Sequence, residues 1–116
     1  MMLLPLALVA CSDGSASMNA ELATGGDARR GAAIIRQRGC GACHVIDGVA
    51  GAHGQVGPSL EDFAARPYIA GNLTNTPDEA VRWIMDPQVI EPNTVMPDLG
   101  LSEAEARDVA AHLYSQ

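Results

Sequence analysis

Two thiols and an imidazole lie close together in this sequence. Cys40 and Cys43 are separated by two small residues, and His44 directly follows the second cysteine. On a helical turn, positions i and i+3 share a face, so both sulfurs can reach the two vinyl groups of one porphyrin edge. This is the spacing of a c-type haem attachment site. We therefore predict one covalently bound haem c, with Cys40 and Cys43 as thioether anchors and His44 as an axial iron ligand.

Two other kinds of site use a Cys-x-x-Cys pair. A redox dithiol would lie at a helix N-terminus after a strand, and no alternating β-branched run precedes Cys40. A zinc site needs a second closely spaced pair, whereas His53 and His112 are far apart and the remaining cysteine is Cys11. Haem attachment is the better explanation. We expect His53 to be solvated in its glycine-rich loop and His112 to be partly exposed, with neither of them an iron ligand.

A methionine is the best candidate for the second axial ligand. Met96 lies in the segment Pro87 to Gly100, which has three prolines and no helical period and is predicted to be an extended strap over the other haem face. A thioether is a soft, neutral ligand that raises the reduction potential, and a His/Met pair leaves no open position on the iron. Met85 has the spacing of a core residue, so we assign the ligand role to Met96.

Two more residues could hold the cofactor in place. Ligating imidazoles usually donate their other N–H to a carbonyl, and Pro58 fixes a turn that could carry this acceptor. The guanidinium of Arg66 matches the geometry of a haem propionate, but Arg66 could equally be an exposed surface arginine.

Helical patterns surround these residues. Asp27 is a plausible N-cap for a helix over 28–38, and Thr76 and Ser102 begin two more helices with capping-box signatures. A short helix is predicted over Ser59 to Arg66. Gly31, with the small Ala106 and Ala110, predicts a close crossing of the first and last helices. The fold class is therefore all-α, with about four helices around one haem.

Composition limits the function. The 116 residues form one small domain, and their 3% aromatic content is too low for a self-sufficient core, so we expect the haem to complete it. The net charge is −7, and all seven cations are arginines. This charge excludes nucleic acid and favours basic partners. Neither a nucleophile paired with a general base nor a substrate pocket can be recognised. We therefore expect an electron carrier and not an independent enzyme, and we expect no small-molecule substrate.

The N-terminal sequence indicates export. Residues 1–10 are an apolar run too short to span a bilayer, and Leu8 to Cys11 resembles the lipobox of bacterial lipoproteins. We predict a lipoprotein-type signal peptide over 1–10, a lipidated Cys11 with a flexible tether over 11–26, and the haem domain over 27–116. Because the run has no Lys or Arg, a plain secretory signal or a late start remains the alternative. The protein is then expected on the periplasmic side, anchored to a membrane by Cys11.

Taken in order, these motifs resemble the class I cytochrome c family over about residues 27–116. The resemblance rests on Cys40-x-x-Cys43-His44, Gly57-Pro58, Trp83-x-x-Asp86-Pro87, Met96-Pro97 and an alanine-rich last helix. Residues 66–73 and 75–100 look most like the cytochrome c domain fused to subunit II of some haem-copper oxidases.

That family implies a small cytochrome c fold, His/Met ligation and one-electron transfer through an exposed haem edge in a respiratory chain. It also implies that the Pro58 carbonyl orients His44 and that Trp83 packs near Met96. The expected partners are a terminal oxidase, a cytochrome bc-type complex or a dehydrogenase. This chain differs in lacking the lysine ring that mitochondrial-type members use for docking. A haem-based sensor or the small haem subunit of a dehydrogenase is the alternative.

Overall fold

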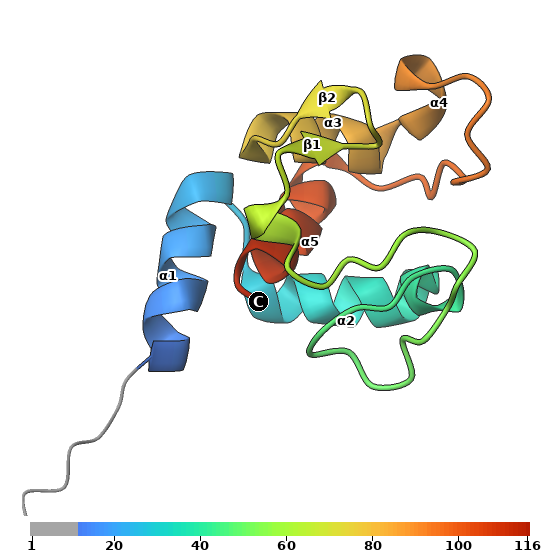
Figure 1. Ribbon diagram of the computed structural model, residues 1–116. Coiled ribbons are helices and arrows are strands. Elements are labelled where there is room, and N and C mark those ends of the chain that lie inside the picture. Colours follow the sequence, from blue (N-terminus) through green and yellow to red (C-terminus); the bar gives the residue numbers. More distant parts are fainter. Residues whose placement is uncertain (1–11) are drawn as a thin grey trace, which may run out of the picture.

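The structure is a computed structural model that describes residues 12–116, so the predicted signal peptide and Cys11 lie outside the described residues. Its helices are α1 (Ser12–Thr24), α2 (Ala28–Arg38), α3 (Pro77–Met85), α4 (Pro87–Ile90) and α5 (Glu103–Tyr114). Two 3₁₀ turns span Cys40–Ala42 and Phe63–Ala65, and β1 (Tyr68–Ile69) pairs antiparallel with β2 (Leu73–Thr74). The predicted all-α fold is confirmed, with this two-stranded ribbon as an addition (Figure 1).

Helix α2 has the predicted bounds. The Asp27 side chain accepts a hydrogen bond from the Arg30 backbone N–H at 2.9 Å, and this bond lowers the pKa of the Asp27 carboxyl. The helix ends at Gly39, whose φ of 72° lies in the left-handed region that glycine adopts without a Cβ penalty. The end of α2 therefore delivers the chain directly into the attachment turn at Cys40.

Helices α2 and α5 cross in close contact, as predicted (Figure 1). A Cβ on Gly31 would overlap the Asp108 carbonyl oxygen, and Ala106 and Ala110 are completely buried. Helix α5 begins with the expected capping box between Ser102 and Glu105, and the Ser102 backbone N–H lowers the pKa of Glu105. The small residues thus let the two backbones approach and fix the direction of α2.

The expectation of a flexible tether over 11–26 is wrong for the described part, because residues 12–24 form α1 and this helix packs against α5. Its buried residues are small and lie one helical turn apart, at Ala20 and Thr24. The Thr24 hydroxyl donates to the Ala20 carbonyl at 2.7 Å, and Arg107 donates to the Thr24 carbonyl at 2.9 Å. Because these buried residues are small, the segment has no repeat of large apolar residues, which is the usual sequence signal of an amphipathic helix.

The junction between α1 and α2 is also held by α5. A Cβ on Gly26 would overlap the Arg107 backbone carbonyl. The buried Asp108 carboxylate accepts from the Asp27 N–H at 2.8 Å and pairs with Arg30 at 3.2 Å. Helix α1 is therefore part of the folded domain within residues 12–116. None of the described helices combines the length and apolar character needed to cross a membrane.

Two further predictions need correction. The helix expected over Ser59 to Arg66 is reduced to the 3₁₀ turn Phe63–Ala65, because Asp62 has a φ of 55° and the Ser59 hydroxyl accepts from the nearby Glu61 N–H. The expected extended strap begins with the helical turn α4, because a proline at the first position favours helix initiation.

His112 was expected to be partly exposed, but its exposed fraction is 5%. It lies on the inward side of α5, and its Nε2 is 2.8 Å from the Asp47 carbonyl oxygen, which can only accept a hydrogen bond. A backbone carbonyl thus satisfies the buried ring. Such a long-range partner could not be identified from the sequence.

The close helix crossing gives a first prediction. Gly31→Ala is expected to lower the free energy of unfolding of the haem-loaded protein by about 3 kcal/mol, because α2 and α5 must separate to admit the methyl group. Gly14→Ala is the matched control, since a Cβ there meets nothing within 4 Å; it should leave stability unchanged or raise it by up to about 1 kcal/mol. Urea unfolding followed by circular dichroism measures both, and equal stability of the two variants would contradict this account of the crossing.

Candidate haem site

One cleft of about 390 Å³ brings the predicted site residues together. Cys40, Cys43, His44 and Pro58 line one side, and Trp83 and Met96 line the same cleft from α3 and the strap. Arg66 also lies in the lining. In Figure 1, α2 and the loop after it lie on one side of the molecule, and α3, α4 and the strap lie on the other. Residues separated by more than 50 positions therefore face a common space.

The attachment turn is a 3₁₀ helix that continues from α2. The N–H groups of Cys43 and His44 both donate to the Cys40 carbonyl, at 3.2 and 3.0 Å. Cys40 and Cys43 are free thiols of intermediate exposure, and burial raises the pKa of the Cys40 thiol. The turn thus presents two thiols and one imidazole to the cleft.

The His44 ring is oriented by backbone atoms. Its Nδ1 is 2.6 Å from the Pro58 carbonyl oxygen, so Nδ1–H is the donor and Nε2 keeps its lone pair for a metal. The ring also lies against Gly57, where a Cβ would overlap His44 Cε1. Gly57 N–H in turn donates to the Cys43 carbonyl at 2.7 Å. Sequence analysis selected the Gly57-Pro58 pair, but it did not reveal the contact between Gly57 and the His44 ring.

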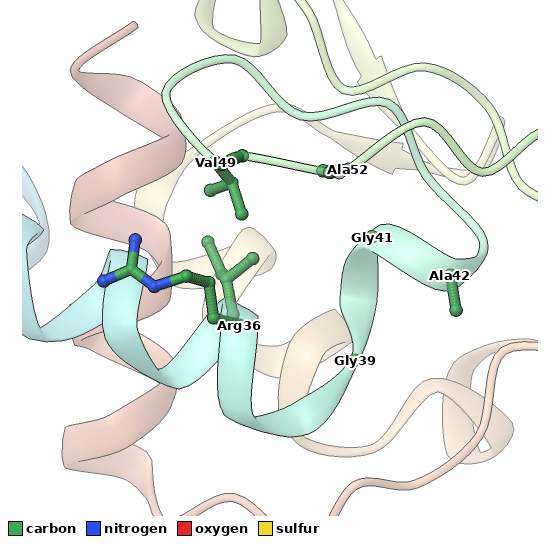
Figure 2. A pocket seen from close by; sticks show the side chains of 9 residues that line it. Arg36, Gly39, Gly41, Ala42, Val49 and Ala52 are labelled. Atoms are coloured by element: carbon green, nitrogen blue, oxygen red, sulfur yellow. The ribbon is translucent and has the colours of Figure 1, made fainter.

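The loop after His44 folds back on the attachment turn. Gly54 N–H donates to the Gly41 carbonyl at 3.0 Å, and a Cβ on Gly54 would overlap the Ala42 carbonyl. His53 is exposed in this loop and does not line the cleft. A second hollow of about 310 Å³ lies between this loop and the end of α2, with Arg36, Val49 and Ala52 in its lining (Figure 2). It contains none of the predicted ligands, so the larger cleft is the candidate cofactor site.

Met96 is held on the opposite side by its backbone. The Gln88 side chain on α4 donates to the Met96 carbonyl at 2.6 Å, and the Met96 N–H donates to the Thr94 hydroxyl at 3.2 Å. Met96 lines the cleft, whereas Met85 packs against the hydrophobic core and is not in the cleft lining. The helical turn α4 thus supports the segment that carries Met96, whereas the prediction of an extended strap included no such helical support.

These residues fit a covalently attached haem. Two thiols and an imidazole lie on one side of a mainly apolar cleft, a thioether lies across it, and the imidazole already has its second nitrogen engaged. Comparison with known proteins agrees, since the family model described as Cytochrome c matches residues 28–116. The chain belongs to the cytochrome c family. Members carry covalently bound haem c and transfer electrons.

The chain is also 33% identical, over 89 residues, to "Cytochrome c oxidase subunit 2" of Alkalihalophilus pseudofirmus. The match covers 76% of this chain but only 25% of that relative, so this cytochrome spans about a quarter of its length. The relative's name agrees with the resemblance to an oxidase-fused domain. No solved structure matches. Helix α1 precedes the part of the chain that the family model matches.

Two arginines line the cleft of this cytochrome. Arg66 donates from Nη2 to the carbonyls of Ser59 and Glu61, the latter at 3.1 Å, and so holds the segment that follows Pro58. Arg38, which the sequence analysis did not select, donates to the Leu99 carbonyl at 2.6 Å. Because Arg38 ends α2 and Leu99 belongs to the strap, this bond joins the two sides of the site.

Asn75 connects the cleft to α5. Its amide nitrogen donates to the carbonyls of Phe63 and Arg66, both at 2.8 Å, and its oxygen accepts from the Tyr114 hydroxyl. Burial raises the pKa of Tyr114 to about 12, and the Phe63 and Tyr114 rings meet edge to face at 5.2 Å. Sequence reasoning missed Asn75, because its three partners lie 9, 12 and 39 positions away.

The contact between Gly57 and His44 gives a second prediction. Gly57→Ala should push the imidazole off the Pro58 carbonyl and destabilise the native iron environment by about 2 kcal/mol. The measurement is the absorption spectrum of the oxidised cytochrome in a urea titration, which should lose its native form at lower urea. Val89→Ala changes an exposed residue on α4 outside the cleft lining and is the control. If Gly57→Ala and the control lose the native spectrum at the same urea concentration, the orientation of the His44 ring does not depend on the absence of a side chain at Gly57.

Proposed function

We propose that this cytochrome is a one-electron carrier with a single haem c, whose iron is bound by His44 and Met96. One observation carries the proposal: His44, with Nδ1–H donated to Pro58, and Met96 line the same cleft from opposite sides. Because the sequence has one Cys-x-x-Cys-His motif, it provides for one haem. The iron supplies the ferric–ferrous couple, and the protein supplies ligation, orientation and exclusion of water.

Each residue has a distinct part in this proposal. Cys40 and Cys43 hold the cofactor by thioether bonds, and Pro58 fixes the tautomer of His44. Trp83 covers the cleft from α3. The guanidinium of Arg66 has five N–H donors, of which Nη2 is used for backbone carbonyls, so the others can bind a propionate. With both axial positions filled, no site remains for a substrate, which favours a carrier over an enzyme or a gas sensor.

We further propose that the cytochrome works outside the cytoplasm, between respiratory-chain components. The lipobox-like sequence before Cys11 supports export and a lipid anchor. The printed name of the oxidase-subunit relative supports a terminal oxidase as one partner, with a cytochrome bc-type complex or a dehydrogenase as donor.

The axial assignment is tested by Met96→Ala. The reduced variant should bind carbon monoxide at neutral pH, and its reduction potential should fall by about 100 mV or more, within the ~0.8 V range over which axial ligands set haem potentials. Met85→Leu is the control, because Met85 packs in the core and leucine has a similar volume. If the wild-type protein binds carbon monoxide as readily as the Met96→Ala variant, Met96 is not a ligand and the carrier proposal fails.

The lipid anchor is tested by intact mass spectrometry of the cytochrome extracted from membranes. The expected chain begins at Cys11 and carries acyl groups, and Cys11→Ala should abolish this modification while leaving the haem spectrum unchanged. A mature chain that begins elsewhere, or an unmodified Cys11, would exclude the lipoprotein assignment.

A further inference from the structure

We propose that the outer face of helix α1 lies flat on a neutral phospholipid surface and inserts Met18 and Leu22 among the lipids. This inference rests on the proposed lipid anchor at Cys11. It adds a second contact with the membrane, which the folded domain itself makes, and this contact gives the cytochrome one fixed orientation on the lipid.

The outer face of α1 is apolar. The helix buries Ala20 and Thr24, at 4% and 1% exposure, where it packs against α5, whereas Met18 and Leu22 are 61% and 80% exposed. Met18 and Leu22 are each two positions from Ala20, which is about 200° around the helix, so they lie on the side opposite α5. They are four positions apart, the spacing of neighbours on one helix face. Two large apolar side chains therefore lie together in solvent.

This outer face carries no charge. Between Gly14 and Thr24 the only charged residue is Glu21, and its carboxylate accepts a hydrogen bond from the Ala28 N–H at 3.1 Å, at the junction with α2. Helices that bind membranes by charge are rich in lysine and arginine, and α1 has neither. Because the chain has a net charge of −7, anionic lipids would repel it. The face therefore suits a neutral lipid surface.

The predicted anchor brings this face to the lipid. Cys11 directly precedes Ser12, the first residue of α1, so no residue separates an acylated Cys11 from the helix. At a rise of about 1.5 Å per residue, Met18 and Leu22 lie about 9 and 15 Å along the helix axis from Ser12. Attachment through the acyl chains makes the second contact intramolecular, so a weak contact by two side chains is sufficient.

A protein partner fits this face less well than lipid does. Specific protein interfaces bury on the order of 1,200 Å² or more in total, which is far beyond what two side chains supply. A second copy of the chain would also bring a second net charge of −7 to the same place. Neither objection applies to a neutral lipid surface that the anchor already holds nearby.

The fixed packing of α1 sets the orientation of the whole domain. Arg107 donates to the Thr24 carbonyl at 2.9 Å, and a Cβ on Gly26 would overlap the Arg107 backbone carbonyl. None of the residues 12–24 lines the haem cleft. In Figure 1, α1 lies at one edge of the molecule, whereas the strap and the loop after α2 extend to the opposite edge. Contact of α1 with lipid thus leaves the haem cleft uncovered.

The test uses the haem-loaded, lipidated cytochrome in vesicles of phosphatidylcholine. The haem and the anchor occupy the three native cysteines, so a nitroxide label reacts with one introduced cysteine. Met18→Cys and Leu22→Cys place the label on the outer face, and Val89→Cys, at a position 71% exposed on α4, is the control. Electron paramagnetic resonance compares relaxation of the label by oxygen, which enters lipid, and by a water-soluble nickel chelate. The ratio of oxygen to nickel accessibility should be several-fold higher at positions 18 and 22 than at position 89.

A matched pair of substitutions tests whether the native side chains make the contact. With the label at position 18, Leu22→Ser should lower the ratio of oxygen to nickel accessibility several-fold, because serine gains little from entering lipid. Val89→Ser should leave the ratio unchanged. The ratio should also persist at high salt, since no charge on the face contributes to the contact.

Three results would overturn the lipid contact. Labels at positions 18 and 22 could be as accessible to the nickel chelate as the label at position 89, or the accessibility ratio could fall as salt is added. Spin–spin coupling between labels would show that a second copy covers the face. Failure of the anchor is separately visible in the intact mass, as a Cys11 without acyl groups, and failure of the carrier function as absent covalent haem.

Discussion

The orientation of one imidazole is the constraint on which the site depends. The Nδ1 of His44 is hydrogen-bonded to the Pro58 carbonyl, and the imidazole ring packs against the backbone of Gly57. Gly57 is in turn joined to the residue before His44, because its N–H donates to the Cys43 carbonyl. These contacts all use backbone atoms, which move less than side chains. The position of Nε2 is therefore set by the loop as a whole.

The helix crossing transmits this rigidity. Because α2 touches α5 through the backbone at Gly31, the end of α2 has a fixed position, and the attachment turn starts there. Helix α5 is also connected to the cleft lining, because Tyr114 donates to Asn75 and Asn75 donates to the carbonyls of Phe63 and Arg66. Since one helix supports both regions, a change in α5 should alter the geometry of the cleft even though the ligands lie elsewhere.

Much of this could be predicted from local sequence, because capping residues and the attachment motif act over a few positions. The bounds of α2 and the capping box at Ser102 are of this kind. The sequence did not reveal α1, the burial of His112 or the role of Asn75, because each depends on a partner far along the chain. The helix predicted over Ser59 to Arg66 fails for a local reason. Asp62 has a left-handed backbone conformation, and the Ser59 hydroxyl accepts from the Glu61 N–H in a turn instead of capping a helix.

The core and the cofactor site are one continuous apolar body. Ile69, Ile84 and Leu113 are buried core residues that also line the cleft, so a haem in the cleft would pack directly against the core. A haem in this position would complete the core of a chain that has only 3% aromatic residues. Apolar surface that a bound group removes from water stabilises the folded state alone, because the unfolded chain cannot form the cleft. Folding and burial of the haem are therefore coupled, and a substitution that loosens the α2–α5 crossing should weaken both.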